Sequence, residues 1–208
     1  MLYQNAVPPP TLELLKKISA LGQLQSFALG GGTNLALRLG HRLSVDLDFF
    51  TNTSFSTQEL FQLITKMFSD SELLFEQNQT IMFSINSVKI DFVLYPFTWL
   101  QPFYKTEGIQ LLNEIDIIPM KLQALSNRNA KKDYWDVYTL LNRYSVEEML
   151  KIFKTKFPQV DTGFIIHSLT DFEKADTEPD PDVYINISWN EIKLELINKV
   201  RSYAEGML

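Results

Sequence analysis

Alternating apolar and polar residues predict a strand over Val45–Phe49. Asp46 and Asp48 alternate there with three apolar residues. Side chains two positions apart on a strand share a face, so both carboxylates are expected on one face, roughly 6–7 Å apart along the strand. The opposite face is expected to point toward a core through the apolar members, which are Val45, Leu47 and Phe49. The pattern therefore predicts a strand with a buried apolar side and an acidic side.

A second strand with the same alternation is predicted over Val88–Tyr95, where Lys89 and Asp91 alternate with apolar residues. The run Thr80–Ile85 is its expected partner, joined through the turn Asn86-Ser87. We expect this meander to lie beside the first strand and to bring Asp91 close to the two acids there. The three carboxylates would then form one cluster.

A glycine turn precedes the acidic strand. The short apolar run Gln25–Leu29 predicts a buried strand, and Asn34–Leu39 predicts a helix that stops at Gly40. The glycines between them, Gly31 and Gly32, therefore link a strand to a helix N-terminus. Unpaired N–H groups at such an end favour an anion, and glycine allows a phosphate to approach closely. A turn that only reverses the chain is the alternative.

Helices are predicted through the rest of the chain from apolar periodicity and capping signals. Two capping boxes open helices, at Ser56–Glu59 and Ser145–Glu148, and Pro119 is expected in the first turn of another. The expected helices are 11–21, 56–69, 118–128, 132–143, 145 to just before Pro158, 160–170 and 189–204. Asp176–Asp182 is expected to be an acidic, turn-rich loop.

The predicted fold is α+β, with a small mixed sheet flanked by helices over residues 1–110 and a mainly helical region over 111–208. Apolar residues make up 45% of the 208, which is enough for a sizeable core. The chain contains no cysteine, so disulfides and thiolate metal sites are excluded. We find neither a membrane-spanning stretch nor a secretory signal, and we expect a cytoplasmic protein.

The chemistry of the predicted site is that of metal-assisted phosphate transfer. Carboxylates such as Asp46, Asp48 and Asp91 bind hard divalent cations, and paired cations about 3.5–4 Å apart stabilise both oxygens of an in-line displacement. A glycine turn beside such a cluster would hold the phosphates, and the Thr33 hydroxyl could add a donor.

The spacing of the glycines and the acids resembles the polymerase-beta-like nucleotidyltransferase superfamily. The string Gly31–Phe50 is similar, more narrowly, to the AbiEii/AbiGii toxin nucleotidyltransferases, and Met120–Leu125 and Lys132–Leu141 resemble later motifs of that family. The resemblance implies that the triphosphate is held by Gly31, Gly32 and Thr33. It implies magnesium, with two ions expected, at Asp46 and Asp48, and it matches Asp91 to the superfamily's third acid.

The resemblance also assigns two residues in the helical half. Lys121 matches a lysine expected to contact the nucleotide phosphates, and Asp136 matches an aspartate needed for activity. Helical spacing independently places Lys121 and Arg128 on one face, where they could meet a polyphosphate or an RNA backbone. An ordinary salt bridge between Asp136 and Lys132 is the alternative for the aspartate.

The predicted function is magnesium-dependent transfer of a nucleoside monophosphate from a nucleoside triphosphate (NTP) to an acceptor hydroxyl. By resemblance the acceptor is RNA, with the tRNA acceptor end as the leading candidate, and the chain is the toxin of a pair with a cognate antitoxin encoded nearby. The net charge of −6 gives no general attraction to RNA, but lysines and arginines gather between residues 121 and 156. The alternatives are transfer to a small antibiotic-type molecule, for which the acids of 171–182 are the hint, and a non-catalytic nucleotide-binding module.

Overall fold

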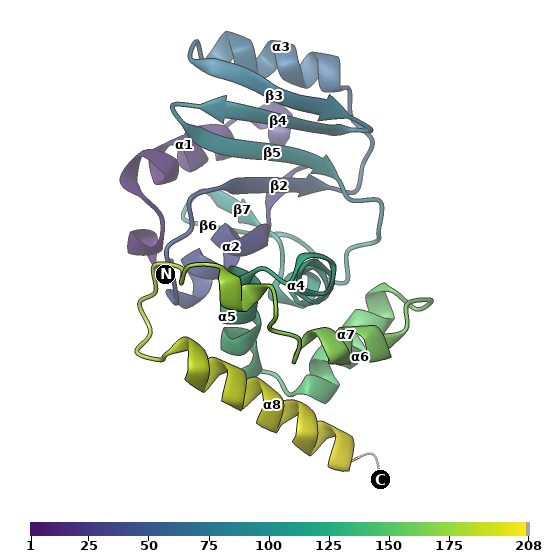
Figure 1. The fold of residues 1–208 in the computed structure, drawn as a ribbon. Helices are drawn as coiled ribbons and strands as arrows, with labels where there is room; N and C mark the ends of the chain where they lie inside the picture. Colours follow the sequence, from purple (N-terminus) through teal and green to yellow (C-terminus); the bar gives the residue numbers. More distant parts are fainter. Residues whose placement is uncertain (207–208) are drawn as a thin grey trace. The chain divides into compact units, whose positions relative to one another are not determined.

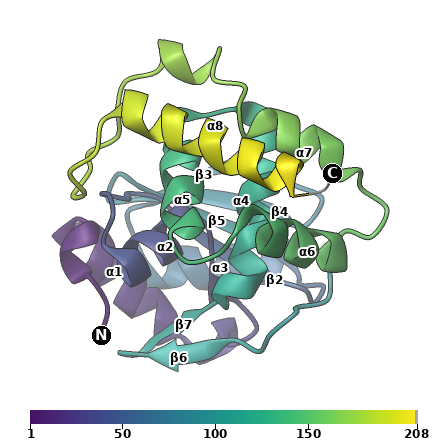
Figure 2. The ribbon, with the colours of Figure 1, turned by 90° about the horizontal axis from the view of Figure 1, so that it is seen from below.

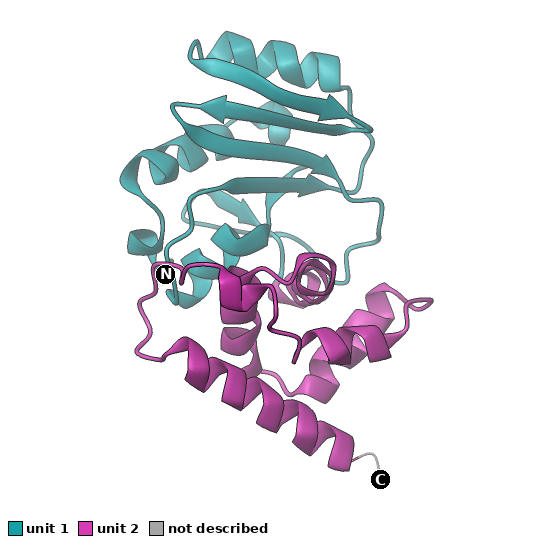
Figure 3. Cartoon of the chain, viewed as in Figure 1, with its two compact units in different colours: residues 1–113 teal, residues 114–208 magenta. Residues whose placement is uncertain are grey.

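The structure is a computed structural model that describes residues 1–206. It divides into two compact units, residues 1–113 and 114–208 (Figure 3). In the described residues, no helix is both long enough and apolar enough to span a bilayer.

Unit 1 contains a mixed β-sheet and the helices that accompany it. In chain order its elements are the 3-10 helix η1 (Gln4–Ala6), α1 (Pro9–Ser19), the 3-10 helix η2 (Gly22–Leu24), β1 (Ala28–Leu29), α2 (Gly31–Leu39), β2 (Leu47–Thr51), α3 (Thr57–Met67), β3 (Ser71–Gln77), β4 (Thr80–Ile85), β5 (Val88–Leu94), β6 (Tyr104–Thr106) and β7 (Ile109–Leu111).

The sheet has seven strands in the order β3-β4-β5-β2-β1-β7-β6, and Figure 1 shows the first four of them side by side. Two neighbouring pairs are parallel, β2 with β5 and β1 with β7, and the other pairs are antiparallel. The turn between β4 and β5 has positive φ at both Asn86 and Ser87, as a tight two-residue hairpin requires. The predicted mixed sheet and its meander are confirmed.

One face of this sheet is closed by α1 and α3. Apolar side chains from the two helices join those of the strands in one buried cluster, which includes Ile18, Ile64, Phe49, Phe83 and Phe92. Phe92 stands at its centre and makes ring contacts with Phe27, Phe49 and Phe83. The alternate residues of β2 and β5 therefore point to the other face, which carries the acids.

Unit 2 is helical. Its elements are α4 (Glu114–Arg128), α5 (Lys131–Leu141), α6 (Val146–Lys156), α7 (Thr162–Ser168), the 3-10 helix η3 (Ala175–Thr177) and α8 (Trp189–Glu205). Helix α4 packs against α5, α6 and α7, and α8 packs against α5 and α6. Figures 1 and 2 both show α8 running beside α5. The predicted capping box at Ser145 and Glu148 is present.

Two boundaries predicted from the sequence are wrong. Helix α4 begins at Glu114, so Pro119 lies inside it rather than in its first turn. Acids in the first turn favour this earlier start because they interact with the helix dipole. The acidic strand begins at Leu47 rather than at Val45, and Val45 is 50% exposed instead of facing the core.

Three strands were not predicted. Strand β3 is an edge strand of sequence Ser-Glu-Leu-Leu-Phe-Glu-Gln, and it lacks alternation. A β-bulge falls between Leu73 and Phe75, so the register that alternation would report is itself interrupted. Strands β6 and β7 have three residues each, which is too short for periodicity to reveal them.

Candidate functional site

The glycine turn packs directly against the acidic strand. Gly31 has φ +61, and a Cβ atom built on it would lie 2.2 Å from Oδ2 of Asp48. Both facts require glycine, since the left-handed backbone is strained for other residues and the space for a side chain is already filled. The backbone N–H of Gly30 donates to the carbonyl oxygen of Asp48 at 2.8 Å. The glycine turn and Asp48 therefore hold each other in place.

Helix α2 begins at this turn, and no side chain caps its N-terminus at Gly30. The first N–H groups of the helix are therefore available to an anion, which the helix dipole also favours. A buried cation lies beside them, because Nη2 of Arg42 would be 2.3 Å from a Cβ atom on Gly32. Arg42 follows the end of this helix by only three residues.

Thr33 acts within the protein. Its hydroxyl lies 2.8 Å from the hydroxyl of Ser44 and donates a hydrogen bond to the carbonyl oxygen of Asp46. The Thr33 side chain is buried. Its hydroxyl therefore ties the start of α2 to the start of the acidic segment, and its backbone N–H is the group that could meet a phosphate.

Two of the three carboxylates face each other across parallel strands. Asp48 of β2 is the direct partner of Asp91 of β5, so their Cα atoms are about 4.8 Å apart. Asp46 lies one residue before β2, and extending the same register by one residue places it level with Lys89. The sheet thus brings together the acids that the sequence places 43 positions apart, as the pairing of Asp48 with Asp91 shows.

A lysine that the sequence analysis did not select stands among these acids. Nζ of Lys89 lies 2.6 Å from Oδ2 of Asp91. Burial acts to lower the pKa of Lys89, but the hydrogen bond to Asp91 and the negative charges of Asp91, Asp48 and Asp46 outweigh it and raise the pKa. All three carboxylates are therefore close enough to act on one ammonium. The i, i+2 spacing of Lys89 and Asp91 was the available signal.

The donor set fits a hard divalent cation. Asp91 is 8% exposed, and its Oδ1 has no hydrogen-bond partner although the atom is buried. A buried carboxylate oxygen in that state is costly unless a ligand satisfies it. Among residues 1–206, no three acid, histidine or cysteine side chains are already gathered tightly enough to count as a metal site. A cation would thus draw the carboxylates together.

In unit 2, Lys121 and Asp136, both predicted to be site residues, form an ion pair with each other. Nζ of Lys121 lies 2.6 Å from Oδ2 of Asp136 and 3.1 Å from Oδ1 of Asp133. Arg128 donates two hydrogen bonds to the carboxylate of Asp133, from Nε at 2.6 Å and from Nη2 at 2.8 Å. Helical spacing predicted that Lys121 and Arg128 share a face, but it did not show that both bind the aspartates of α5.

The two aspartates of this cluster are fully buried, so their charges depend on these cations. Burial acts to raise the pKa of Asp133, but the charge of Lys121 and the hydrogen bond and charge of Arg128 outweigh it and lower the pKa. The side chain of Lys121 is 6% exposed. Asp136 is therefore placed to hold and orient this ammonium, an ion pair different from the Lys132 bridge considered at the sequence level.

The basic residues between 121 and 156 do not form one basic surface. Lys131 and Lys156 are buried, and Lys156 pairs with the buried Asp116 at 2.6 Å. Arg143 pairs with Glu114 at 3.1 Å. Acids distant in sequence therefore neutralise several of the basic residues that gather between 121 and 156 in the sequence.

Acids of the segment 171–182 bind residues of α5 and α8 within unit 2. Asp176 accepts hydrogen bonds from Nε1 of Trp189 at 2.6 Å and from Nζ of Lys193 at 2.8 Å. Asp180 pairs with Lys131 at 3.1 Å, and Glu178 accepts from the backbone N–H of the same lysine at 2.8 Å. Asp176, Glu178 and Asp180 therefore bind other residues of unit 2.

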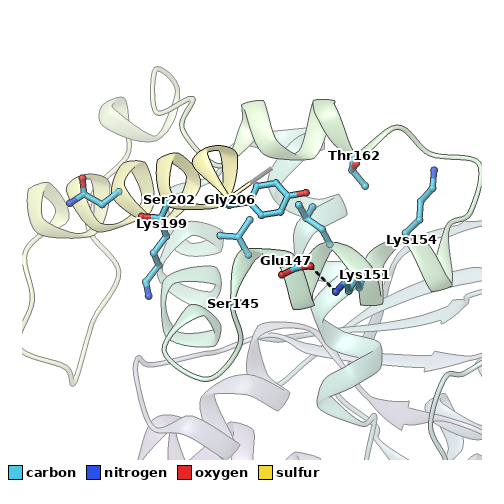
Figure 4. A pocket seen from close by; sticks show the side chains of 12 residues that line it. Ser145, Glu147, Lys151, Lys154, Thr162, Lys199, Ser202 and Gly206 are labelled. Atoms are coloured by element: carbon cyan, nitrogen blue, oxygen red, sulfur yellow. Dashed lines mark ion pairs between the residues drawn. The ribbon is translucent and has the colours of Figure 1, made fainter. Parts of the chain in front are cut away.

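A cavity of about 720 Å³ opens between α6, α7 and α8 (Figure 4). Three lysines reach it, Lys151, Lys154 and Lys199, and Figure 4 shows Lys151 directed toward Glu147, with which it pairs at 2.7 Å. None of the residues predicted for the site lines this cavity.

A model of a known protein family matches most of the chain. The model of the family described as "Nucleotidyl transferase AbiEii toxin, Type IV TA system", where TA denotes toxin–antitoxin, matches residues 13–204. The chain belongs to this family. The matched range includes the glycine turn at Gly31, the acids Asp46, Asp48 and Asp91, and the ion pair of Lys121 with Asp136. The resemblance noted in the sequence is confirmed, and this AbiEii-family chain is a nucleotidyltransferase.

A relative and two solved structures are similar over most of their lengths. The AbiEii-family chain is 33% identical over 202 residues to the protein aq_aa25 of Aquifex aeolicus (strain VF5), covering 93% of this chain and 96% of that one. JHP933 of Helicobacter pylori has a similar structure, with a TM-score of 0.60 and 18% identity over 97% of this chain and 92% of that one. MenT4, a nucleotidyltransferase toxin of Mycobacterium tuberculosis H37Rv, has a TM-score of 0.54 and 14% identity over 93% and 84%. At these identities the two structures show a shared fold.

Proposed function

We propose that this AbiEii-family enzyme transfers a nucleoside monophosphate from a nucleoside triphosphate to an acceptor hydroxyl in a magnesium-dependent reaction. The observation that carries the proposal is the contact between Gly31 and Asp48, with Asp91 directly opposite in the next strand. One end of the sheet thereby offers N–H groups for phosphates and carboxylates for a cation within a few ångströms.

Each group of the chain has a distinct role in this proposal. The N–H groups at Gly31, Gly32 and Thr33 bind triphosphate oxygens. Asp46, Asp48 and Asp91 hold magnesium, with two ions expected, which would supply Lewis-acid stabilisation of the charge that develops on the phosphate oxygens.

The transfer itself exchanges one phosphorus–oxygen bond for another. The acceptor oxygen bonds to the α-phosphorus, the bond from that phosphorus to the bridging oxygen breaks, and pyrophosphate leaves. Asp91 is also expected to accept the hydroxyl proton. Lys121, oriented by Asp136, is expected to offset the charge of the leaving phosphates, and Arg128 supports this cluster through Asp133.

The proposed acceptor is RNA, with the tRNA acceptor end as the leading candidate. Support comes from the toxin family to which the chain belongs, which is described as part of a type IV toxin–antitoxin system and so implies a cognate antitoxin. In unit 2, the cavity between α6 and α8 offers lysines beside the apolar side chains of Leu150 and Tyr203, a combination suited to a nucleotide strand.

The test is transfer of label from each of the four α-labelled triphosphates to total RNA, to protein and to small hydroxyl compounds that include an aminoglycoside. We expect labelled RNA with the wild type and none with Asp46→Ala or Asp48→Ala. Asp70→Ala, which removes an exposed aspartate from the same unit, is the matched control and should retain activity.

Two outcomes would replace the proposal. Label on the aminoglycoside alone would identify a small-molecule transferase. Absence of transfer together with absence of magnesium-dependent triphosphate binding by calorimetry, in a folded protein, would identify a non-catalytic module.

A further inference from the structure

Lys89 lies at the carboxylate cluster, and the proposed reaction gives it no role. It shares a face of β5 with Asp91, because the two residues are two positions apart, and its ammonium lies 2.6 Å from Oδ2 of Asp91. Asp46 lies one residue before the neighbouring strand β2, and extending by one residue the register that pairs Asp48 with Asp91 places it level with Lys89. The ammonium thus contacts Asp91, and the negative charges of Asp48 and Asp46 also act on it.

A cation in that place competes with any other cation that uses the same oxygens. Lys89 engages Oδ2 of Asp91, whereas the buried Oδ1 of the same carboxylate has no hydrogen-bond partner. A divalent ion could bind Oδ1 while the lysine stays on Oδ2, but at Oδ2 the ion would compete with the lysine, and its charge would repel the ammonium. Full use of Asp91 therefore requires that Lys89 move.

The position of Lys89 permits such a movement. Its side chain is 44% exposed, whereas that of Asp91 is 11% exposed, so the lysine occupies the outer side of the pair. An ion pair with one partner this exposed is weak, and release of the lysine to water costs little. The carboxylate, in contrast, is fixed in a central strand between β4 and β2.

We propose that Lys89 is a resident counter-cation that neutralises part of the carboxylate cluster and must release Asp91 when a divalent ion binds. The inference rests on the proposed magnesium role of Asp46, Asp48 and Asp91. Lys89 is therefore a positioning residue: it holds Asp91 in place and weakens the intrinsic affinity of the site for the ion.

The test measures metal binding directly. Mg²⁺ is titrated calorimetrically, and Mn²⁺ by electron paramagnetic resonance, into the full nucleotide-free chain. Lys89→Met removes the charge and keeps most of the length, and it should bind both ions about tenfold more tightly than the wild type. Lys89→Arg retains the charge and should bind like the wild type. Lys66→Met, at an exposed lysine of α3, is the control for loss of a remote positive charge.

Thermal melting establishes that each variant is folded, and Lys89→Gln provides a second neutral variant. Unchanged or weaker ion binding by both neutral variants would overturn the inference, and so would equal tightening in Lys89→Arg, since the effect would then not depend on charge. Tighter binding that accompanies a complete lack of nucleotide transfer would leave the inference standing and overturn the proposed function. Failure of the wild type and of both neutral variants to bind either ion would overturn the inference and the metal role together.

Discussion

The two units use the same residue types for opposite electrostatic purposes. In unit 1, three aspartates act on the partly exposed ammonium of Lys89, on the sheet face opposite α1 and α3. In unit 2, Asp133 and Asp136 are fully buried and are bonded to Lys121 and Arg128. An accessible excess of carboxylates attracts an external cation, whereas a buried, balanced cluster holds its own members in place. The first arrangement suits metal binding and the second suits orientation of a lysine.

The largest expected effect concerns catalysis in the sheet cluster. Asp48→Asn should lower kcat/KM for nucleotide transfer by about a thousandfold, because it removes a charge that the reaction needs. The free energy of unfolding should change by less than about 1 kcal/mol, since Asp48 is only half-buried. Steady-state kinetics and urea unfolding of the same samples measure both quantities. A loss of activity that merely follows a loss of stability would contradict the contrast between the units.

The helical cluster should respond in the opposite sense. Asp133→Asn leaves Lys121 and Arg128 without a shared buried counter-charge and should cost about 3–5 kcal/mol of unfolding free energy. Urea denaturation gives this value. Asp182→Asn, at an exposed aspartate of the same unit, is the control and should be neutral. Equal stabilities of the two variants would show that these buried ion pairs do not stabilise unit 2.

A smaller effect separates backbone strain from crowding at the glycine turn. Gly31→Ala and Gly108→Ala both place alanine at positive φ, +61 and +83, and this backbone strain alone should cost each variant about 1–2 kcal/mol of stability. Only at Gly31 does the new Cβ atom meet Asp48, because nothing lies within 4 Å at Gly108. Nucleotide transfer should therefore fail in Gly31→Ala alone. Similar activity in both variants would mean that nucleotide transfer does not depend on the close approach of Gly31 to Asp48.

The smallest expected effect is the acid dependence of the helical cluster. The pKa of Asp133 is lower in the folded chain than in the unfolded chain, because Lys121 and Arg128 outweigh burial. Between the two pKa values the unfolded chain binds more protons, so stability increases with pH there. The contribution is complete above about pH 4 and is lost as the pH falls through the folded pKa.

Urea unfolding at about pH 3 and about pH 7 tests this dependence. The stability difference between the wild type and Asp133→Asn should be smaller at the lower pH. A difference that does not change with pH would show that Asp133 acts through packing rather than through charge.

Much of the site was predictable because it is local in sequence. The turn at Gly31 and the acids at 46 and 48 lie within one strand–helix–strand segment, where periodicity and glycine chemistry are informative. The predicted start of the acidic strand was two residues too early. The alternation of apolar and polar residues predicted that Val45 faces the core, whereas its side chain is exposed. The helix around Pro119 was misplaced for a related reason: a proline signal for a first turn was overridden by the five residues before it.

The partners of charged residues were the least predictable feature. Lys156 lies 40 positions from Asp116, with which it forms a buried pair, and Asp180 lies 49 positions from Lys131. A linear sequence shows such lysines as a basic cluster and such aspartates as an acidic loop. Only the folded chain shows that each set neutralises the other.

By itself, the sequence determined the α+β class, the family, and the glycine turn and acids that make up the candidate site. These follow from residue types and short spacings, which constrain local backbone and side-chain direction. The tertiary structure decided that Asp91 stands opposite Asp48, that Lys89 is held among the acids, and that Lys121 is bonded to Asp136. Such pairings depend on strand register and helix packing, which are collective results of burying the whole apolar surface.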